Sequence, residues 1–317
     1  MAKNPERITK WAPIVGRWEV TDTIVSYLGP QQTQLPVPIG ICVSNYRFSE
    51  GEVKALVHLP EKFGGTEDEA SGRILVGFKS LDLPYLMVGL GGYNCAYAVS
   101  QFQPGRGWIG VAVAGSWENL LKNHTYELTV RVSGQRIMLS VDGVRVLEHI
   151  LEMPLPEGQL GVSTWGEHKI EFQDVIVQPE AGTAFVIMQF TSEYQELYSD
   201  VIKPVVEKFA LNAYHAGEVF RPGIVLEDIV QGIVESKLII AEITPPNQNV
   251  FYELGYAHAL RKPAILLAEE GKALPFDISG YRCLFYENSI GGKRKVEEGL
   301  VKHLSAILRE DARDWTP

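Results

Sequence analysis

The spacing of apolar residues changes near residue 183, and this change limits the folds that are open to the chain. Before it, apolar and polar residues alternate in residues 40–48, 52–58, 72–78, 126–132, 136–141 and 170–177. After it, continuous apolar runs such as 183–188 and 237–242 alternate with segments of helical spacing. Alternation is typical of strands with one buried face, and continuous runs are typical of buried parallel strands. We therefore expect two domains, residues 1–178 and 183–317, joined by a linker at 179–182.

The first domain is predicted to be an antiparallel β-sandwich. Its strands are separated by turn residues, and Asp142-Gly143 stands between two of them, where glycine tolerates the positive φ of a tight hairpin.

The second domain is predicted to be a flavodoxin-like parallel sheet, because strands and helices alternate along it. The expected strands are residues 183–188, 210–216, 237–242, 264–268 and 283–286. The expected helices are residues 193–209, 224–235, 249–260 and 295–308.

Charge and cysteine content exclude several classes of function. Residues 1–180 carry 15 Lys and Arg against 20 Asp and Glu, and the remainder carries 14 against 19. Neither half has the basic excess of a nucleic-acid-binding domain, so no nucleic-acid partner is expected. No apolar run is long enough to suggest a membrane span, and no metal-binding spacing is present. Three widely separated cysteines favour reduced thiols and a cytoplasmic protein.

Residues 126–177 resemble the end of a concanavalin A-like jelly roll of the laminin-G or glucanase type. The resemblance rests on residues 124–132, Val141-Asp-Gly-Val144, residues 155–162 with Trp165-Gly166, and Phe172-Gln-Asp-Val175. It implies a fold and not a ligand, because this sandwich occurs in lectins, hydrolases and inert modules. The domain is therefore expected to be a sensor or interaction module with a glycan or protein ligand.

Two groups of residues in the sandwich have both a functional and a structural interpretation. The acidic cluster Glu67-Asp68-Glu69 is the nearest match to a glucanase carboxylate pair, but its glycine-rich setting favours a solvated loop. The aromatic residues Tyr85, Tyr93, Tyr97 and Trp108 could line a sugar-binding face or pack in the core.

Residues 249–260 (NVFYELGYAHAL) place one carboxylate, Glu253, in an otherwise apolar and aromatic helix. An unpaired buried carboxylate is costly, so Glu253 needs a partner or faces a pocket where its charge is used. Asn249 precedes it by four residues and Tyr256 follows it by three, so the three share one helix face. The alternative is that Glu253 caps its own helix N-terminus without any catalytic role.

Further polar and aromatic residues follow the carboxyl ends of the predicted parallel strands, where ligands bind in open sheets. Gln189 and Phe190 follow the first strand, Arg221-Pro-Gly223 and Asp228 precede or begin a helix, and Glu242 ends the third strand. Asp228 could instead be a solvated helix residue, and Glu242 could only hydrogen-bond the following loop.

The second domain resembles the nucleoside 2-deoxyribosyltransferase-like superfamily, which is close in fold to bacterial TIR-like domains. The resemblance rests on residues 185–190 (FVIMQF), 236–244 (SKLIIAEIT), 249–259 and 262–267 (KPAILL). It implies chemistry at an N-glycosidic bond, with Glu253 as the catalytic carboxylate. Gln189, Phe190, Asp228, Glu242, Asn249, Tyr252 and Tyr256 would bind the substrate, and the aromatic rings of Phe190, Tyr252 and Tyr256 would stack on a base.

Three residues depart from the family pattern; together they favour a binding protein, and the loss of the acid at Asn247 shifts the expected reaction. Gln189 replaces a proline, Glu242 replaces an aspartate, and Asn247 replaces the second acid of the transferases. Hydrolysis of a nucleotide, with NAD⁺ as substrate and no cofactor, is therefore favoured over nucleoside transfer. Such proteins resemble bacterial stress or antiphage effectors that assemble as homo-oligomers. The alternatives are a deoxyribosyltransferase, or a nucleotide-binding signalling protein without turnover.

Overall fold

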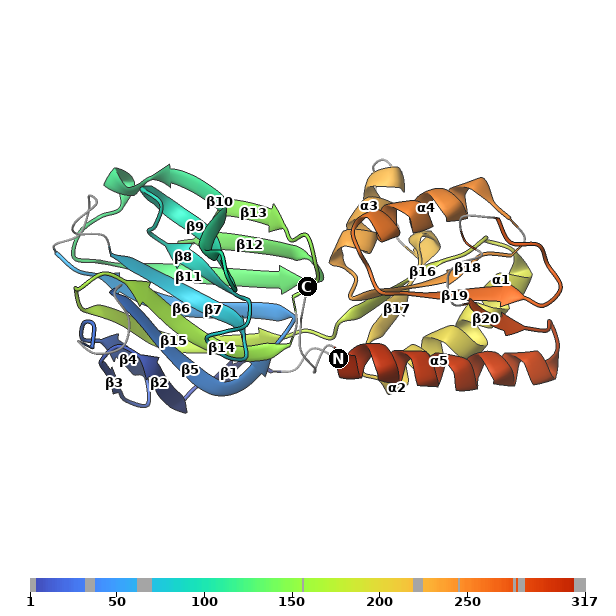
Figure 1. Cartoon of the computed structure of the whole chain (residues 1–317), viewed down its shortest axis with the longest axis horizontal. Coiled ribbons are helices and arrows are strands. Elements are labelled where there is room, and N and C mark those ends of the chain that lie inside the picture. Colours follow the sequence, from blue (N-terminus) through green and yellow to red (C-terminus); the bar gives the residue numbers. More distant parts are fainter. Residues whose placement is uncertain are drawn as a thin grey trace.

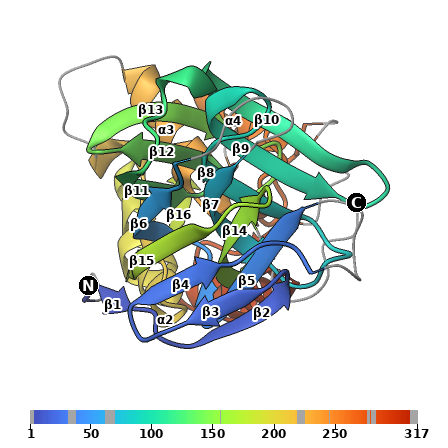
Figure 2. The ribbon, with the colours of Figure 1, turned by 90° about the vertical axis from the view of Figure 1, so that its left-hand side faces the viewer.

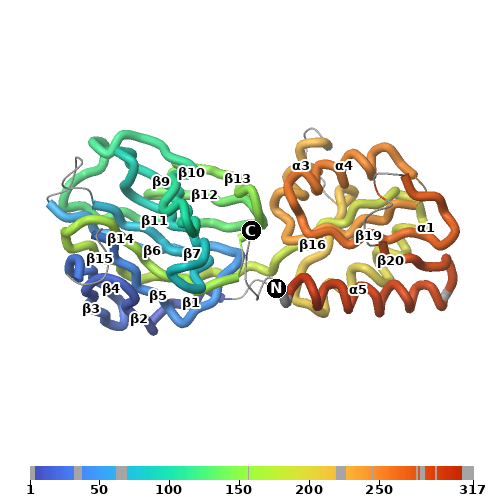
Figure 3. The backbone as a smooth tube through the Cα atoms, viewed as in Figure 1, coloured from blue at the N-terminus to red at the C-terminus, as the bar shows by residue number. Residues whose placement is uncertain are grey.

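The structure is a computed structural model, and it describes residues 4–31, 38–61, 70–155, 157–218, 225–244, 246–275, 278 and 283–310. Two antiparallel sheets form one half of the molecule, and a parallel sheet with helices forms the other (Figure 1). The chain passes between the halves through residues 180–182, which connect strand β15 to strand β16 (Figure 3).

The first half consists of an eight-stranded and a seven-stranded sheet (Figure 2). The eight-stranded sheet has the order β13-β12-β11-β6-β15-β4-β3, with β1 paired to β15. It contains β1 (Glu6–Arg7), β3 (Trp18–Val20), β4 (Ile24–Tyr27), β6 (Gly51–Leu59), β11 (His124–Ser133), β12 (Arg136–Val141), β13 (Val144–Ile150) and β15 (Ile170–Pro179). The seven-stranded sheet has the order β10-β9-β8-β7-β14-β5-β2. It contains β2 (Trp11–Val15), β5 (Ile39–Phe48), β7 (Ser71–Phe78), β8 (Tyr85–Leu90), β9 (Cys95–Gln103), β10 (Gly107–Ser116) and β14 (Gly158–Trp165).

The two sheets enclose one hydrophobic core, so the predicted all-β sandwich is confirmed. Alternate residues of each strand enter this core, including Ile74 and Val76 of β7 and Leu128 of β11. Leu75 lies between the first two and belongs to a separate apolar cluster on the outer face of the seven-stranded sheet. The chain changes sheet from β5 to β6, from β6 to β7 and from β14 to β15, in agreement with a jelly-roll type of sandwich.

The predicted hairpin at Asp142-Gly143 is also confirmed, because it joins β12 to β13. Asp142 has φ of 49° and Gly143 has φ of 76°. Two consecutive positive φ values are those of a type I′ turn, whose twist matches that of the flanking strands.

The second half contains a five-stranded sheet of order β17-β16-β18-β19-β20, in which every pairing is parallel. Its strands are β16 (Thr183–Ile187), β17 (Asn212–Tyr214), β18 (Leu238–Glu242), β19 (Ala264–Glu269) and β20 (Cys283–Tyr286). In chain order the strands are arranged 2-1-3-4-5, which is compatible with the predicted flavodoxin-like sheet.

Helices cover both faces of the parallel sheet (Figure 1). The helices α1 (Ser192–Leu197), α2 (Lys203–Lys208) and α5 (Ile290–Glu310) lie on one face, with a π-helical turn at Tyr198–Ile202 between α1 and α2. The helices α3 (Val225–Glu235) and α4 (Gln248–Ala259) lie on the other face. Within the described ranges, no helix is long and apolar enough to cross a membrane.

The sandwich contacts the parallel sheet at the amino ends of its strands, so the carboxyl edge points away from the sandwich (Figure 1). The turn between β11 and β12 forms the contact. The backbone N–H of Gln135 donates to the carbonyl oxygen of Val234 at 3.0 Å, and its side-chain Nε2 donates to that of Leu260 at 3.0 Å. Arg136 forms an ion pair with Glu235 at 3.1 Å. The sandwich therefore binds the C-terminal ends of α3 and α4.

We expect Gly134→Ala to destabilise this junction. Gly134 has φ of +57°, and a Cβ there would lie 2.6 Å from the carbonyl oxygen of Val234. Gly143 also has a positive φ, but no atom lies within 4 Å of a Cβ added there, so Gly143→Ala is the matched control. The control should cost about 1 kcal/mol of the free energy of unfolding, and Gly134→Ala about 2 kcal/mol more, in urea denaturation. Equal costs would show that the close approach contributes nothing.

Candidate functional site

The carboxyl edge of the parallel sheet contains the point at which the direction of winding changes. The chain leaves β16 towards α1 on one face of the sheet, and it leaves the neighbouring β18 towards α4 on the other face. In open parallel sheets such a switch point leaves a crevice in which ligands bind. The residues predicted from the sequence are distributed around this edge.

Asn247, and not Glu253, caps the N-terminus of α4. The Asn247 side-chain oxygen accepts hydrogen bonds from the backbone N–H groups of Asn249 at 2.9 Å and Val250 at 3.3 Å. Glu253 lies beyond the first turn, where the backbone N–H groups already have helical partners. The alternative that Glu253 serves as the helix cap is therefore wrong, and Asn247 fills that role instead.

Glu253 is a half-buried carboxylate without a partner in the described part of the chain. No hydrogen bond or ion pair joins it to another described residue, and burial alone raises its pKa to about 7. The group is therefore partly protonated at neutral pH, and its charged form is poorly solvated. A carboxyl group in this state can stabilise a positive charge that develops beside it, or exchange a proton near neutral pH.

Helix α4 separates a buried stripe from an exposed aromatic side. Val250, Leu254 and Ala257 are buried against the sheet, and Tyr256 packs partly against the same cluster. Tyr252 is 59% exposed, so its ring is free for contact with a ligand. Asn249, which shares a face with Glu253 by helical spacing, is also exposed.

Glu242 lies on the opposite face of the sheet from α4. Its carboxylate accepts hydrogen bonds from the Thr244 backbone N–H at 2.9 Å and from the Tyr286 hydroxyl at 2.9 Å, and the residue is only 1% exposed. Burial raises its pKa to about 7 despite these bonds. Tyr286 belongs to the hydrophobic cluster that packs against α1 and α5. The Glu242 side chain therefore faces that side of the sheet, whereas Glu253 is carried by α4 on the other side. The structure thus shows Glu242 bonded to the following loop, as the alternative interpretation expects.

Phe190 and Gln189 follow β16 and lie near the end of β17. The Phe190 ring is 56% exposed and lies 5.2 Å from the ring of His215, measured between centroids. His215 is buried, which lowers its pKa, and its Nδ1 accepts a hydrogen bond from Gly217 at 3.1 Å. Phe190 therefore offers an exposed aromatic surface at the edge, on the β17 side of the switch point.

Asp228 is half-buried on α3, which packs beside α4 on the same face of the sheet. The structure thus places Asp228 and Glu253 on neighbouring helices. The predicted Arg221-Pro-Gly223 segment lies outside the described residues, as does the acidic cluster Glu67-Asp68-Glu69. Within the described ranges, no group of three or more His, Cys, Asp or Glu side chains could hold a metal ion.

Sequence reasoning missed the hydroxyl groups around Glu242. Tyr194 of α1 donates to Glu269 at 3.3 Å, and the Thr244 hydroxyl accepts from the Glu269 backbone N–H at 2.9 Å. Together with Tyr286 they form a hydrogen-bonded layer at the ends of β18, β19 and β20. The available signal for Thr244 and Tyr286 was their position at or just after the ends of predicted strands, whereas Tyr194 lies in a predicted helix and gave no such signal.

A separate cavity of about 290 Å³ lies on the outer face of the seven-stranded sheet. Trp108, Trp165 and Tyr93 line it, together with Arg73. Arg73 is buried and donates a hydrogen bond to the Ser100 hydroxyl at 2.8 Å. Aromatic rings beside a fixed polar group are suited to the apolar face and the hydroxyl groups of a sugar ring.

The four aromatic residues considered from the sequence divide between the two interpretations. Tyr93 and Trp108 line the cavity. Tyr85 is buried in the outer apolar cluster, and Tyr97 packs against the core between the sheets. Trp165 was not predicted to line a ligand face, because its strand partner was not known from the sequence.

No protein-family model and no curated protein matches the chain. Among solved structures, a carbohydrate-binding module CBM66 from Bacillus subtilis has a TM-score of 0.44 and 16% identity, over 54% of this chain and 97% of that chain. A native glycosidic hydrolase has a TM-score of 0.42 and 11% identity, over 56% and 96%. A protein of unknown function with a galectin-like fold from Bacillus subtilis has a TM-score of 0.35 and 10% identity, over 56% and 96%. These TM-scores are below 0.5, so the sandwich assignment rests on the strand pairing itself.

We expect Glu253→Gln to stabilise the protein at alkaline pH. A folded-state pKa of about 7, above the ordinary value of 4.5 for a glutamate, means that ionisation of Glu253 reduces stability as pH rises between these values. The variant cannot ionise at this position. Its free energy of unfolding should exceed that of the wild type by about 1 kcal/mol at pH 8, after allowance for solvent screening.

The difference should disappear well below pH 4.5, where the wild-type carboxyl is protonated in both the folded and the unfolded state. Glu127→Gln, which removes an exposed carboxylate on β11, is the control and should show no such trend. A pH-independent difference for Glu253→Gln in chemical denaturation would contradict the assignment.

Proposed function

We propose that the second domain is an N-glycosidase that hydrolyses the N-glycosidic bond of a nucleotide, with NAD⁺ as the preferred substrate and Glu253 as the catalytic carboxylate. The observation that carries the proposal is the state of Glu253, which is half-buried, has a pKa raised to about 7, and has no partner in the described part of the chain. Structural carboxylates are normally paired, so an unpaired one near a ligand edge favours a role towards a bound molecule.

The chemistry of this bond suits a single poorly solvated carboxylate. As the C1′–N bond breaks, both bonding electrons leave with the nitrogen, and nicotinamide departs as a neutral base. The ribose then carries positive charge at C1′, which an ionised Glu253 stabilises electrostatically. Water attacks C1′ and releases a proton, so the products are ADP-ribose, nicotinamide and H⁺.

The exposed aromatic rings at the edge provide the binding surface in this proposal. Tyr252 precedes Glu253 on α4, and Phe190 lies beyond the switch point near β17. Aromatic side chains can stack on any nucleobase, because every base has a π-face. Asn249 and Tyr256 complete the α4 side, and Asp228 on the adjacent α3 would position ribose hydroxyls. Gln189 would contact the substrate next to Phe190, and Glu242 would support the edge through Thr244.

The position of Asn247 favours hydrolysis over nucleoside transfer. The transferases that the domain resembles carry an acidic residue at this position, whereas here the Asn247 side chain caps the N-terminus of α4. A nucleotide-binding protein without turnover remains the alternative. By analogy with the stress and antiphage effectors that the domain resembles, we also propose that it acts as a homo-oligomer.

Incubation with NAD⁺ tests the proposal directly. We expect release of nicotinamide in the wild type and a loss of about 100-fold or more in Glu253→Gln, with Glu127→Gln retaining activity. The rate should rise with pH through about 7, because only the ionised form of Glu253 stabilises the ribose cation. Tight NAD⁺ binding without product would support the binding protein instead. Full activity in Glu253→Gln would refute the catalytic assignment.

A second proposal concerns the sandwich, whose outer cavity favours a glycan ligand. Tyr93 is 43% exposed with φ of 55°, a conformation that asparagine tolerates well. We expect Tyr93→Asn to preserve folding and to weaken glycan binding by about tenfold, as measured on a glycan array and then by calorimetry. Leu121→Ala, at an exposed site outside the cavity, is the control. Binding that is unaffected by Tyr93→Asn would place the glycan elsewhere.

A further inference from the structure

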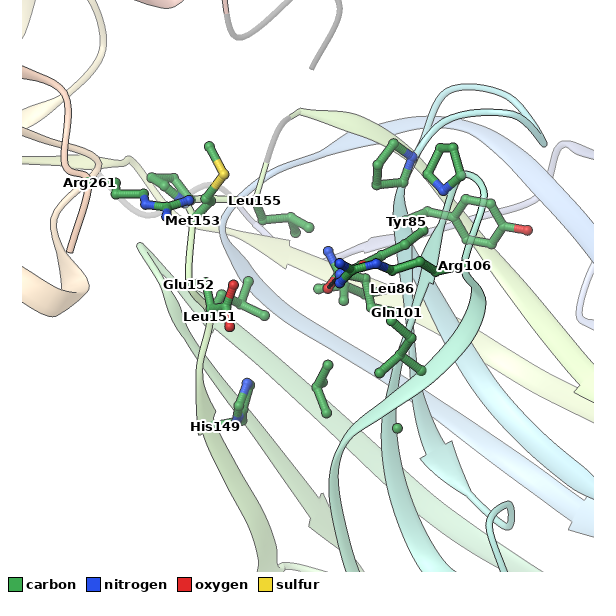
Figure 4. Close-up of a pocket in the computed structure, with 17 residues that line it drawn as sticks. Tyr85, Leu86, Gln101, Arg106, His149, Leu151, Glu152, Met153, Leu155 and Arg261 are labelled. Carbon is green, nitrogen blue, oxygen red and sulfur yellow. Dashed lines mark hydrogen bonds between the residues drawn. The ribbon is translucent and has the colours of Figure 1, made fainter. Parts of the chain in front are cut away.

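A cavity of about 700 Å³ lies where the two halves of the molecule meet (Figure 4). Strands β8, β9 and β10 form one wall, and residues 149–155 form the other. Among the described residues, Arg261 in the turn that follows α4 is the one that the second half contributes. The volume is in the range of small-molecule sites, which cluster at domain interfaces.

The cavity is lined by positively charged and by apolar side chains. Arg106 reaches into the cavity from the β9–β10 turn, and Arg261 lies on the opposite side (Figure 4). Neither guanidinium has an ion pair or hydrogen bond to another described residue. Glu152 is the one carboxylate among the described lining residues, so with two arginines these residues carry a net positive charge. Leu86 and Leu151 supply apolar surface. Free guanidinium groups select phosphate and carboxylate groups.

The backbone of Arg261 gives independent support for a role of its side chain. Arg261 and Lys262 end α4 in a Schellman motif, with Arg261 N–H donating to the His258 oxygen at 2.9 Å and Lys262 N–H to the Ala257 oxygen at 3.0 Å. The residue at this position has a positive φ, here 54°, and is usually glycine. Arginine is unfavourable in this conformation, so its presence is not explained by the stability of the turn.

One buried side chain connects the cavity wall to the ends of both helices. Gln135 is fully buried, and its Nε2 donates to the carbonyl oxygens of Leu151 at 2.9 Å and Leu260 at 3.0 Å. Its backbone N–H donates to Val234 at the end of α3. Gln135 thus provides a direct hydrogen-bonded link from the cavity wall at Leu151 to the C-terminal ends of α3 and α4.

We propose that this cavity is a regulatory site for a small organic phosphate or carboxylate, which binds between Arg106 and Arg261 and acts on α4. The binding site itself does not depend on any activity of the second domain. Its effect on Glu253, which is carried by α4, rests on the proposed N-glycosidase function.

Thermal shift and calorimetry with matched pairs of probes test the binding. The acidic probes are ribose 5-phosphate, AMP and glucuronate, and the uncharged counterparts are ribose, adenosine and glucose. Inorganic phosphate measures the effect of the anion alone. We expect at least one acidic organic probe to raise Tm by about 2 °C or more where its counterpart and inorganic phosphate do not. The identity of that probe distinguishes a phosphate ligand from a carboxylate ligand.

Arg261→Gly and Arg106→Gln should each weaken binding of that probe by about tenfold or more. Glycine is favoured at position 261, so Arg261→Gly should not lower the Tm of the free protein, and lost binding would not reflect misfolding. Arg294→Gln, at an exposed position on α5, is the control and should bind normally. Absence of binding by every acidic probe, or binding as tight as that of the wild type in both cavity variants, would overturn the proposal.

Hydrogen exchange and NAD⁺ cleavage test the coupling separately. Binding of the probe should change amide exchange in α4 in the wild type and in Glu253→Gln, but not in Arg261→Gly. If NAD⁺ is cleaved, the same probe should change the rate by about fivefold or more. Altered exchange in a protein that cleaves no NAD⁺ would support the regulatory site and refute the proposed reaction. Unaltered exchange in α4 would refute the coupling.

Discussion

The buried amide of Gln135 joins the two halves of the molecule, and much of the arrangement depends on it. A buried polar group is costly unless it is hydrogen-bonded, so the bonds that this side chain makes across the junction matter. The Nε2 group of Gln135 donates to the carbonyl oxygens of Leu151 in the sandwich and of Leu260 after α4, and its backbone N–H donates to that of Val234 in the last turn of α3. Its buried Oε1 has no hydrogen-bond partner among the described residues. The last carbonyl groups of a helix have no partner within it, so an external donor there is favourable. The sandwich thus satisfies helix ends that the second domain leaves open.

This contact also determines which edge of the parallel sheet is available to ligands. Because the sandwich occupies the amino edge, the carboxyl edge faces solvent (Figure 1). The helices α3 and α4, whose C-terminal ends contact the sandwich, extend from one edge to the other and offer a route by which the sandwich can act on the carboxyl edge. Glu253 lies on one of these helices, whereas Glu242 lies in a strand and faces the opposite side. A movement of α4 would therefore act directly on Glu253 but not on Glu242.

Several strands and one helix were predicted accurately because the spacing of their apolar residues is regular. The strands at residues 40–48, 170–177 and 283–286 and the helix at 249–260 match the structure within two residues. The helix predicted at 295–308 begins earlier, at Ile290, because two glycines obscured its first turn. Pairing of distant strands could not be read from local spacing, so Arg261 beside the sandwich and Trp165 beside Trp108 were not foreseen. Likewise, β18 is apolar at every position except Glu242, so the spacing of its residues did not show on which face of the sheet Glu242 lies.

Three carboxylates, Glu50, Glu242 and Glu253, have a pKa raised to about 7 by burial, yet their surroundings differ. Glu50 lies at the junction of the two halves, where the charges of Lys237 and Lys262 oppose the effect of burial. Glu242 is held by Tyr286 and Thr244, so each of its carboxylate oxygens already accepts a hydrogen bond. A raised pKa by itself therefore does not identify a functional carboxylate, because a structural one can have the same value. The distinction lies in hydrogen-bonding capacity, and of these three, Glu253 alone has no described group acting on its pKa besides burial. A positively charged ligand beside Glu253 would favour the ionised carboxylate and so lower the pKa that burial has raised. Ligand binding and the ionisation of Glu253 must therefore be coupled.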